Sequence, residues 1–266
     1  MERTIKKMKG LLLLLMLLPF SSVAQTVRGD CDYDGSFGIS DLTALINYLL
    51  TDSWCEQPQD LTRDTVTVNG LSFVMVKVDG GSYSTGEGVT ATVEDFWICQ
   101  TEVTQELWTS VMGSNPSTNR GNGTERWPVE TVGWYDCQSF ISKLNELTGR
   151  TFRMPTSVEW EFAARGGNRS LGFLYAGGNN ADLVAHYNNL VYGGMTKPQD
   201  VALLKPNELG LYDMSGNVYE WCQDTWGNSS HVMRGGCYYW GADQCEVTWS
   251  DHYSTGLRLI GFRLAL

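Results

Sequence analysis

Residues 210–221 read GLYDMSGNVYEW and are the most informative stretch of this chain of 266 residues. They place Asp213 and Glu220 on either side of a short segment that contains Gly216. A carboxylate at each end of a tight glycine turn can enclose a hard cation such as Ca²⁺, with backbone oxygens between the two. The alternative is a turn in which Glu220 accepts hydrogen bonds from backbone amides. The pattern favours the cation site.

Other short motifs surround this stretch in a definite order. They are GGSY (80–83), EVT (102–104), PV (128–129), RMPT (153–156), EWEFAARGG (159–167), PN (206–207), RGG (234–236) and GFR (261–263). Each motif alone is weak, but the ordered series is specific. The series resembles the formylglycine-generating enzyme, or sulfatase-modifying factor, family over residues 70–265.

The resemblance implies an α+β, C-type-lectin-like fold with little regular secondary structure. It also implies a calcium site in the opening stretch. Asp213 and Glu220 would supply carboxylates to that ion, and Gly216 and Val218 would supply backbone carbonyls.

The oxidases of this family convert a sulfatase cysteine within a Cys-x-Pro-x-Arg motif to formylglycine. They use O2 and a Cu(I) ion held by two cysteines five positions apart, and the softness of Cu(I) explains the thiolate ligands. In this chain Cys245 matches the second copper cysteine. Trp240 occupies the first position and has no metal-binding donor.

A further thiol, Cys237, stands where the family usually has serine, eight positions before Cys245. Three interpretations remain open. Cys237 can replace the missing copper ligand, the two cysteines can form a disulfide, or Cys245 is a small buried apolar residue. We therefore expect a binding or structural scaffold of this family. The alternative is a formylglycine-generating oxidase that uses Cys245 and Cys237 as catalytic residues.

The N-terminus predicts export. Four basic residues precede the apolar run 11–18, and Ser22-Val23-Ala24 offers a cleavage site, so residues 1–24 are interpreted as a signal peptide. The chain then acts in the periplasm or at the cell exterior. No later segment is apolar enough to span a membrane. Cleavage changes the formal net charge from −11 to −14, which argues against nucleic-acid partners.

A second calcium site is predicted in residues 25–55. Oxygen-bearing and turn residues occupy positions 1, 3, 5, 7, 9 and 12 of a calcium loop: Asp30, Asp32, Asp34, Ser36, Gly38 and Asp41. An amphipathic helix follows, so the segment resembles a dockerin repeat with an EF-hand-like loop and helix. An acidic surface turn is the alternative. A single repeat argues against cohesin docking. Cys31 and Cys55 flank the module, and we expect them to pair.

The composition divides the rest of the chain into a linker at 56–69 and the family domain at 70–266. An alternating or continuous run of apolar residues predicts a strand at 73–78. Apolar residues at helical spacing predict a helix at 136–148, with Phe140, Leu144 and Leu147 on one face. A second helix is predicted at 157–165 with Ser157 as its N-cap. Glu159 is expected to cap this helix or to pair with Arg153 or Arg165.

Candidate binding residues are aromatic. Flat rings stack on sugars and fill peptide pockets, so a glycan or peptide ligand suits a surface made by Tyr238, Tyr239, Trp240 and Trp249. Packing in the core is the alternative for each ring. The three histidines have no metal-ligand spacing.

Overall fold

The computed structural model describes residues 61–189 and 197–266, which belong to one compact unit. The predicted signal peptide, the calcium loop at 30–41 and the Cys31–Cys55 pair lie outside the described residues.

The domain begins with a three-stranded antiparallel sheet in the order β1-β2-β5. Its strands are β1 (Arg63–Val68), β2 (Leu71–Val78) and β5 (Phe96–Cys99). Asn69 and Gly70 join β1 to β2 with φ angles of 51° and 83°, as a tight Asn-Gly hairpin requires. The strand predicted at 73–78 is confirmed. The predicted linker is too long, because its residues 63–68 form β1 and pair with β2.

Both faces of the sheet are buried where β2 pairs with β5. Met75 and Cys99 belong to one apolar cluster, whereas their neighbours Val76 and Ile98 belong to another. Successive side chains of a strand point to opposite faces, so β2 and β5 separate the two halves of the core. The motif EVT (102–104) comes shortly after β5, so the paired strand fixes where this motif begins.

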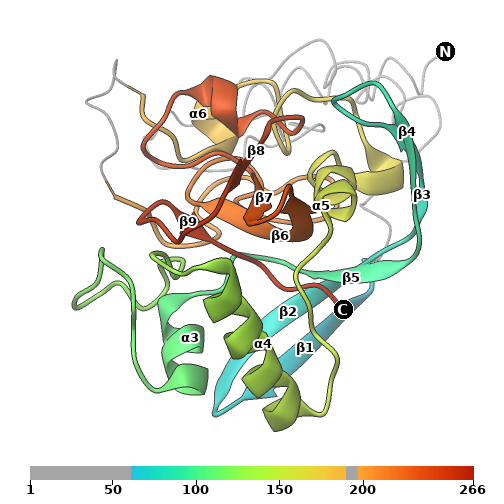
Figure 1. The fold of residues 1–266 in the computed structure, drawn as a ribbon. Helices are drawn as coiled ribbons and strands as arrows, with labels where there is room; N and C mark the ends of the chain where they lie inside the picture. Colours follow the sequence, from blue (N-terminus) through green and yellow to red (C-terminus); the bar gives the residue numbers. More distant parts are fainter. Residues whose placement is uncertain (1–60, 190–196) are drawn as a thin grey trace, which may run out of the picture. The chain divides into compact units, whose positions relative to one another are not determined.

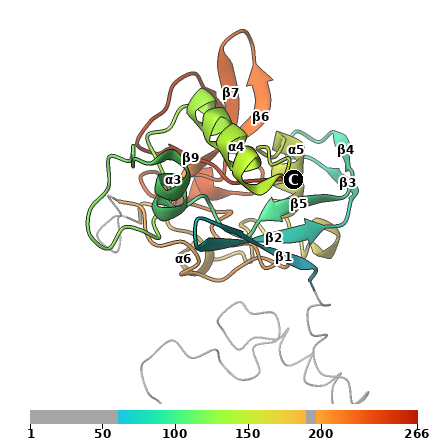
Figure 2. The ribbon, with the colours of Figure 1, turned by 90° about the horizontal axis from the view of Figure 1, so that it is seen from below.

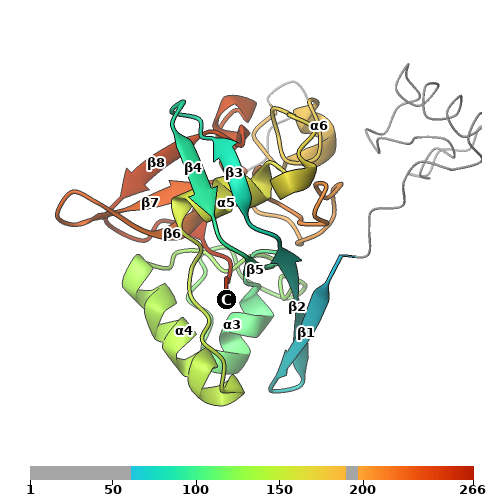
Figure 3. The ribbon, with the colours of Figure 1, turned by 90° about the vertical axis from the view of Figure 1, so that its right-hand side faces the viewer.

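Two helices cover the first cluster, and Figures 1 and 3 show them side by side. They are α3 (Gln105–Met112), which the sequence analysis missed, and α4 (Trp134–Thr148). The rings of Trp108 and Phe140 stack between them with centroids 5.0 Å apart. Phe140 and Leu144 are buried as predicted, but Leu147 is 50% exposed because it lies in the last turn, beside solvent.

Helix α5 (Ser157–Ala164) packs on the other half of the core. Its N-cap is Thr156 rather than the predicted Ser157, since the Thr156 hydroxyl accepts a hydrogen bond from the Glu159 N–H. The Glu159 carboxylate in turn accepts a hydrogen bond from the Thr156 N–H and pairs with Arg153 at 2.7 Å. This confirms the capping role of Glu159 and selects Arg153 over Arg165 as its partner.

A second sheet carries the C-terminal motifs in the order β8-β7-β6-β9. Its strands are β6 (Tyr219–Trp226), β7 (Ser230–Arg234), β8 (Ser250–Tyr253) and the short β9 (Ile260–Gly261). Strands β6 and β9 are parallel, and the other pairs are antiparallel. Figure 2 shows the β6–β7 hairpin projecting from the domain.

Short elements complete the domain: the hairpin of β3 (Gly81–Ser84) and β4 (Thr90–Val93), helix α6 (Ala181–Val184), and the 3-10 turns η1 (Gly167–Arg169) and η3 (Ala242–Cys245). The mixture of small antiparallel sheets and short helices confirms the predicted α+β class. Within the described residues, no helix has the length and apolar character needed to cross a membrane.

Candidate functional site

The stretch 210–221 forms a tight turn that leads into β6. Asp213 and Asn217 adopt left-handed backbone conformations, with φ angles of 58° and 61°. Gly216 has a φ of 85°, and a Cβ atom on it would lie 2.3 Å from the carbonyl oxygen of His186. A side chain at Gly216 is therefore excluded both by its conformation and by the close approach of this second segment.

Glu220 is fully buried at the end of this turn. One of its oxygens accepts bonds from Trp160 Nε1 at 2.7 Å and Arg263 Nε at 2.6 Å, and the other accepts from Arg263 at 2.6 Å. Its partners are thus side chains from the motifs EWEFAARGG and GFR, not the backbone amides of the alternative interpretation. Three motifs that are far apart in sequence meet at this carboxylate.

Glu102 also reaches the turn, which the sequence analysis did not predict. Its carboxylate accepts hydrogen bonds from Asn217 Nδ2 at 2.7 Å and from the Val218 N–H at 3.1 Å. Its sequence signal was the motif EVT, which marked the residue as part of the series without indicating what it contacts. Asp213 accepts a bond from the Ala202 N–H at 2.8 Å.

The charges of this buried group do not balance. Glu102, Asp213 and Glu220 are three buried carboxylates, and Arg263 is the fully buried cation beside them. Burial and the nearby carboxylates raise the pKa of Glu102 well above its usual value. Burial, together with repulsion from Glu220, raises the pKa of Asp213 to about 6. With all three carboxylates ionised, the group would carry excess negative charge, which either protons or a bound cation would neutralise.

These residues fit the predicted calcium site in chemistry and charge. Asp213 and Glu220 lie close enough to interact electrostatically, and Glu220 Oε1, which accepts a hydrogen bond from Arg263, has a lone pair for a further contact. In the described ranges no three His, Cys, Asp or Glu side chains form a metal-holding group, but the predicted set needs only two carboxylates. Glu102 adds charge next to it.

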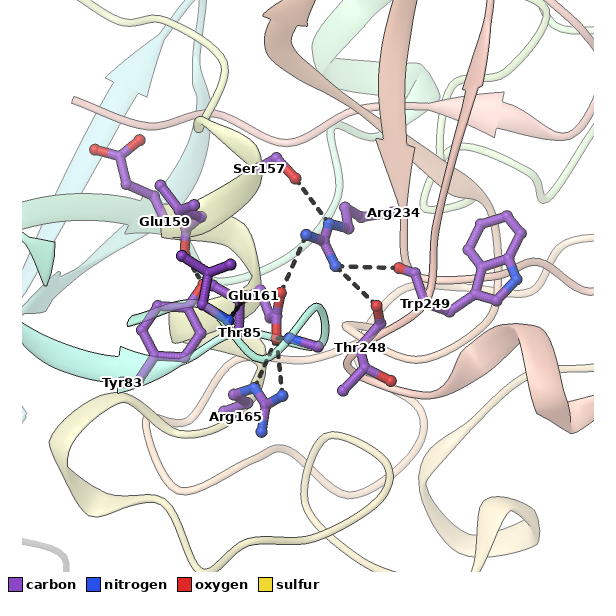
Figure 4. Close-up of polar contacts among 12 residues, drawn as sticks. Tyr83, Thr85, Ser157, Glu159, Glu161, Arg165, Arg234, Thr248 and Trp249 are labelled. Carbon is purple, nitrogen blue, oxygen red and sulfur yellow. Dashed lines mark hydrogen bonds and ion pairs between the residues drawn. The ribbon is translucent and has the colours of Figure 1, made fainter. Parts of the chain in front are cut away.

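The second predicted site lies after the motif RGG. Arg234 holds the end of β7 in place through several contacts (Figure 4). It donates a hydrogen bond to Ser157 Oγ at 2.9 Å and pairs with Glu161 at 3.1 Å. It also donates hydrogen bonds to the carbonyl oxygens of Thr248 and Trp249. Glu161 also pairs with Arg165. This network fixes the starting point of the loop that contains the two candidate cysteines.

Cys237 and Cys245 are both buried and lie close together. A Cβ atom on Gly236 would be 2.7 Å from Cys245 Sγ, and the Cys237 N–H donates to the Cys245 sulfur. Burial raises the pKa of both thiols, that of Cys237 to about 11. Trp240, at the first copper position of the family, is 47% exposed and offers no donor. The residues present do not reproduce the copper pair of the family.

The four candidate aromatic residues separate into two kinds. Tyr238 is buried, and Trp249 stacks on Tyr219 with centroids 5.2 Å apart, so core packing accounts for both. Tyr239 and Trp240 are 37% and 47% exposed and meet edge to face. The guanidinium of Arg258 lies 5.4 Å from the centre of the Tyr239 ring. These three residues form an exposed patch, the 239–240 patch.

Two of the three histidines lie on neighbouring strands: His231 on β7 and His252 on β8 are one register position apart, and His186 lies in another segment. His186 packs against Gly216, His231 stacks on Trp134 with centroids 4.0 Å apart, and His252 pairs with Asp251. Burial lowers the pKa of His186 to about 4, so this side chain is neutral at pH 7.

The arrangement of these motifs is that of a known family. Residues 53–266 match the model of the sulfatase-modifying factor enzyme 1-like domain, and the chain belongs to this family. It is 32% identical over 259 residues to the chaperone protein LppX of Paenibacillus barcinonensis, an alignment that covers 71% of this chain and 90% of that protein.

Two further relatives show how diverse the family is. The formylglycine-generating enzyme of Thermomonospora curvata is 32% identical over 140 residues, which cover 47% of this chain and 44% of that enzyme. The inactive C-alpha-formylglycine-generating enzyme 2 of Mus musculus is 35% identical over 130 residues, which cover 44% of this chain and 39% of that protein. The chain spans less than half the length of these two relatives.

Solved structures confirm the fold. Treponema denticola variable protein 1 superposes with a TM-score of 0.67 and 29% identity, covering 77% of this chain and 98% of that one. CarF superposes with a TM-score of 0.60 and 26% identity, covering 72% of this chain and 97% of that one. The domain thus has the C-type-lectin-like fold of the formylglycine-generating enzymes.

Proposed function

We propose that this protein is an exported, calcium-stabilised binding scaffold of the sulfatase-modifying factor family and that it has no formylglycine-generating oxidase activity. The observation that supports the proposal most directly is the exposed Trp240 side chain at the first copper position. An indole provides no thiolate for Cu(I). In its place the chain presents an aromatic surface.

The ligand is expected to bind at the 239–240 patch. Its two rings and the Arg258 guanidinium combine flat apolar area with a positive charge, which suits a peptide or glycan. The loop with these rings begins at the fixed Arg234 network. A rigid base reduces the conformational entropy that is lost when a ligand binds.

Calcium would stabilise this scaffold at the turn 213–220. The support is the excess of buried carboxylates over buried arginine, with the raised pKa values of Glu102 and Asp213. The predicted signal peptide supports export, where millimolar calcium affinity is sufficient for extracellular modules.

A two-part experiment tests the binding proposal. The mature chain is applied to peptide and glycan arrays, and each hit is measured by calorimetry with the wild type, Trp240→Ala and the matched control Leu203→Ala, which removes another exposed apolar side chain. Binding that falls at least tenfold only in Trp240→Ala supports the proposal. A hit whose affinity is equal in all three proteins places the ligand elsewhere and contradicts it.

The alternative function is the oxidase, and the closeness of Cys237 to Cys245 favours it over other enzymatic reactions. Here Cys237 would supply the second thiol. The chain is incubated with Cu(I), O2 and a Cys-x-Pro-x-Arg peptide, and aldehyde is measured by mass spectrometry. We expect none from the wild type. Aldehyde that disappears in Cys245→Ala would establish the oxidase instead.

The variant Trp240→Cys sharpens this assay, because it restores the spacing of the family's copper pair on the same scaffold. Aldehyde from this variant but not from the wild type would identify Trp240 as the residue that removes the activity. The amount of copper bound per chain is measured on the same samples. It distinguishes a protein that does not bind copper from one that binds copper but does not oxidise the peptide.

A further inference from the structure

The loop after Gly236 brings the backbone of Cys237 next to the buried thiol of Cys245. If Gly236 had a Cβ atom, that atom would lie 2.8 Å from Cys245 Cα and 2.7 Å from Cys245 Sγ, so the two backbone segments are in contact. The Cys237 N–H is directed at the same sulfur. We propose that Cys237 and Cys245 form a reversible disulfide that closes residues 237–245 into a covalent loop.

Cys99, Cys137 and Cys222 are also free and buried, and they lie on β5, α4 and β6. Cys237 belongs to the same apolar cluster as Cys99 and Cys137, whereas Cys245 belongs to a smaller cluster. The backbone contact at Gly236 nevertheless brings Cys237 and Cys245, at the start and end of one loop, next to each other. Disulfides require Cα atoms about 4.4–6.8 Å apart, a range that touching backbones allow.

Cys237 is the thiol that reacts first. Burial raises the pKa of Cys237 above that of a free thiol, but the N–H groups of Tyr239 and Trp240 lie beside its sulfur and favour the thiolate. Cys245 has fewer such donors. Tyr239 and Trp240 are partly exposed, so a local opening of this segment is enough to admit a small oxidant.

The reaction balances with a small-molecule disulfide such as oxidised glutathione. The Cys237 thiolate attacks one glutathione sulfur and releases the other glutathione as a thiol. The Cys245 thiolate then attacks the mixed disulfide and releases the second glutathione. The two protein thiols together lose two protons and two electrons, which the glutathione disulfide takes up.

The disulfide has a consequence for the surface of the protein. The closed loop contains Tyr239 and Trp240, so oxidation would hold the 239–240 patch in one conformation. This consequence rests on the proposed binding function, whereas the disulfide itself does not. Oxidation would also withdraw both thiols from copper.

The test uses the mature chain equilibrated in oxidised or reduced glutathione, followed by denaturation and alkylation of free thiols. Both cysteines lie between Arg234 and Arg258 in one tryptic peptide, so a protease that cleaves before Asp243 is used to separate them. We expect a disulfide-linked pair of peptides after oxidation and two alkylated peptides after reduction. Alkylation of both cysteines after oxidation would overturn the proposal.

Two variants make the result specific. Cys137→Ala removes a buried thiol elsewhere and should leave the linked peptides unchanged. In Cys245→Ser the mixed disulfide between Cys237 and glutathione has no resolving thiol, so we expect Cys237 to carry glutathione after oxidation, and a linkage from Cys237 to another cysteine would contradict the proposal. Oxidation should raise the melting temperature of the wild type by about 5 °C and that of Cys245→Ser by none.

The outcomes remain separable from the proposed function. If the peptides are linked after oxidation but no peptide or glycan binds, the disulfide is supported and the proposed binding function is contradicted. If a ligand binds through Trp240 but Cys237 and Cys245 are both alkylated after oxidation, the binding function is supported and the disulfide is contradicted.

Discussion

The turn at 213–220 and the loop at 237–245 come from neighbouring parts of the sequence, yet they are built differently. Around the turn, buried charges have defined partners, and the glycine is required by the close approach of a second segment. The loop instead contains two buried thiols, which burial keeps neutral, and two partly exposed rings. The comparison indicates that buried ion pairs and close backbone packing hold the turn, whereas the loop combines uncharged buried groups with exposed rings.

The largest expected effect comes from Arg263→Met at the turn. The change leaves Glu220 buried without its cationic partner, so stability should fall by roughly 3–5 kcal/mol. Urea unfolding at pH 7 measures the loss. Arg150→Met is the control, because Arg150 pairs with Asp64 near the surface and such pairs contribute less than about 1 kcal/mol. Equal losses would contradict the distinction between the two ion pairs.

Gly216→Ala should have the next largest effect. The alanine would adopt a positive φ, which costs roughly 1–3 kcal/mol, and its methyl group would collide with the His186 carbonyl. Gly149→Ala is matched in conformation, with a φ of 69°, but has no atom within 4 Å of the added methyl. We expect a larger drop in the urea midpoint for Gly216→Ala. A similar drop for both variants would show that the close approach to His186 adds nothing.

The pH dependence of the unfolding free energy tests both the charge imbalance at the turn and calcium binding there. The raised pKa of Asp213 means that its proton stabilises the calcium-free fold below about pH 6, and that this contribution is lost as the pH rises through 6. The stability of the wild type relative to Asp213→Asn should therefore rise by roughly 1.4 kcal/mol between pH 8 and pH 5 in a chelator.

Calcium should reverse this trend, because the ion needs the ionised carboxylate and competes with the proton. Melting temperatures of both proteins with calcium and with chelator, from pH 5 to pH 8, provide the measurement. His186, whose lowered pKa acts in the opposite direction, is present in both proteins. Equal calcium stabilisation of the wild type and Asp213→Asn at pH 8 would count against the proposed site.

The smallest effect on stability is expected in the loop. Trp240→Ala removes a side chain that is 47% exposed, so unfolding free energy should change by less than about 0.5 kcal/mol. The same urea experiment detects the change. A loss comparable to that of Gly216→Ala would show that the loop supports the fold, and the contrast between the two regions would fail.

The sequence determined much of this protein by itself. The ordered motifs were enough to predict the family and the α+β fold, and alternation or helical spacing located β2 and α4. The placement of Trp240 at the first copper position of the family stays a prediction. The predictions of family, fold and elements succeeded because they depend on local patterns or on a long series of residues in order.

Other features depended on contacts between distant segments. Sequence spacing did not reveal that Glu102 reaches Asn217 and Val218, or that Glu220 pairs with Arg263 and Trp160. The strand β1 was mistaken for a linker, since its polar residues become a strand only when β2 pairs with them.

Only the tertiary structure decided which aromatic rings face solvent and which cysteines meet. Tyr238 and Tyr239 are adjacent in sequence, yet one is buried and the other is exposed. The turns at Gly235 and Gly236 bring Cys237 back to Cys245. Burial and contact across a loop are properties of the packed chain, because a side chain's neighbours are set by where the backbone turns and not by its own type.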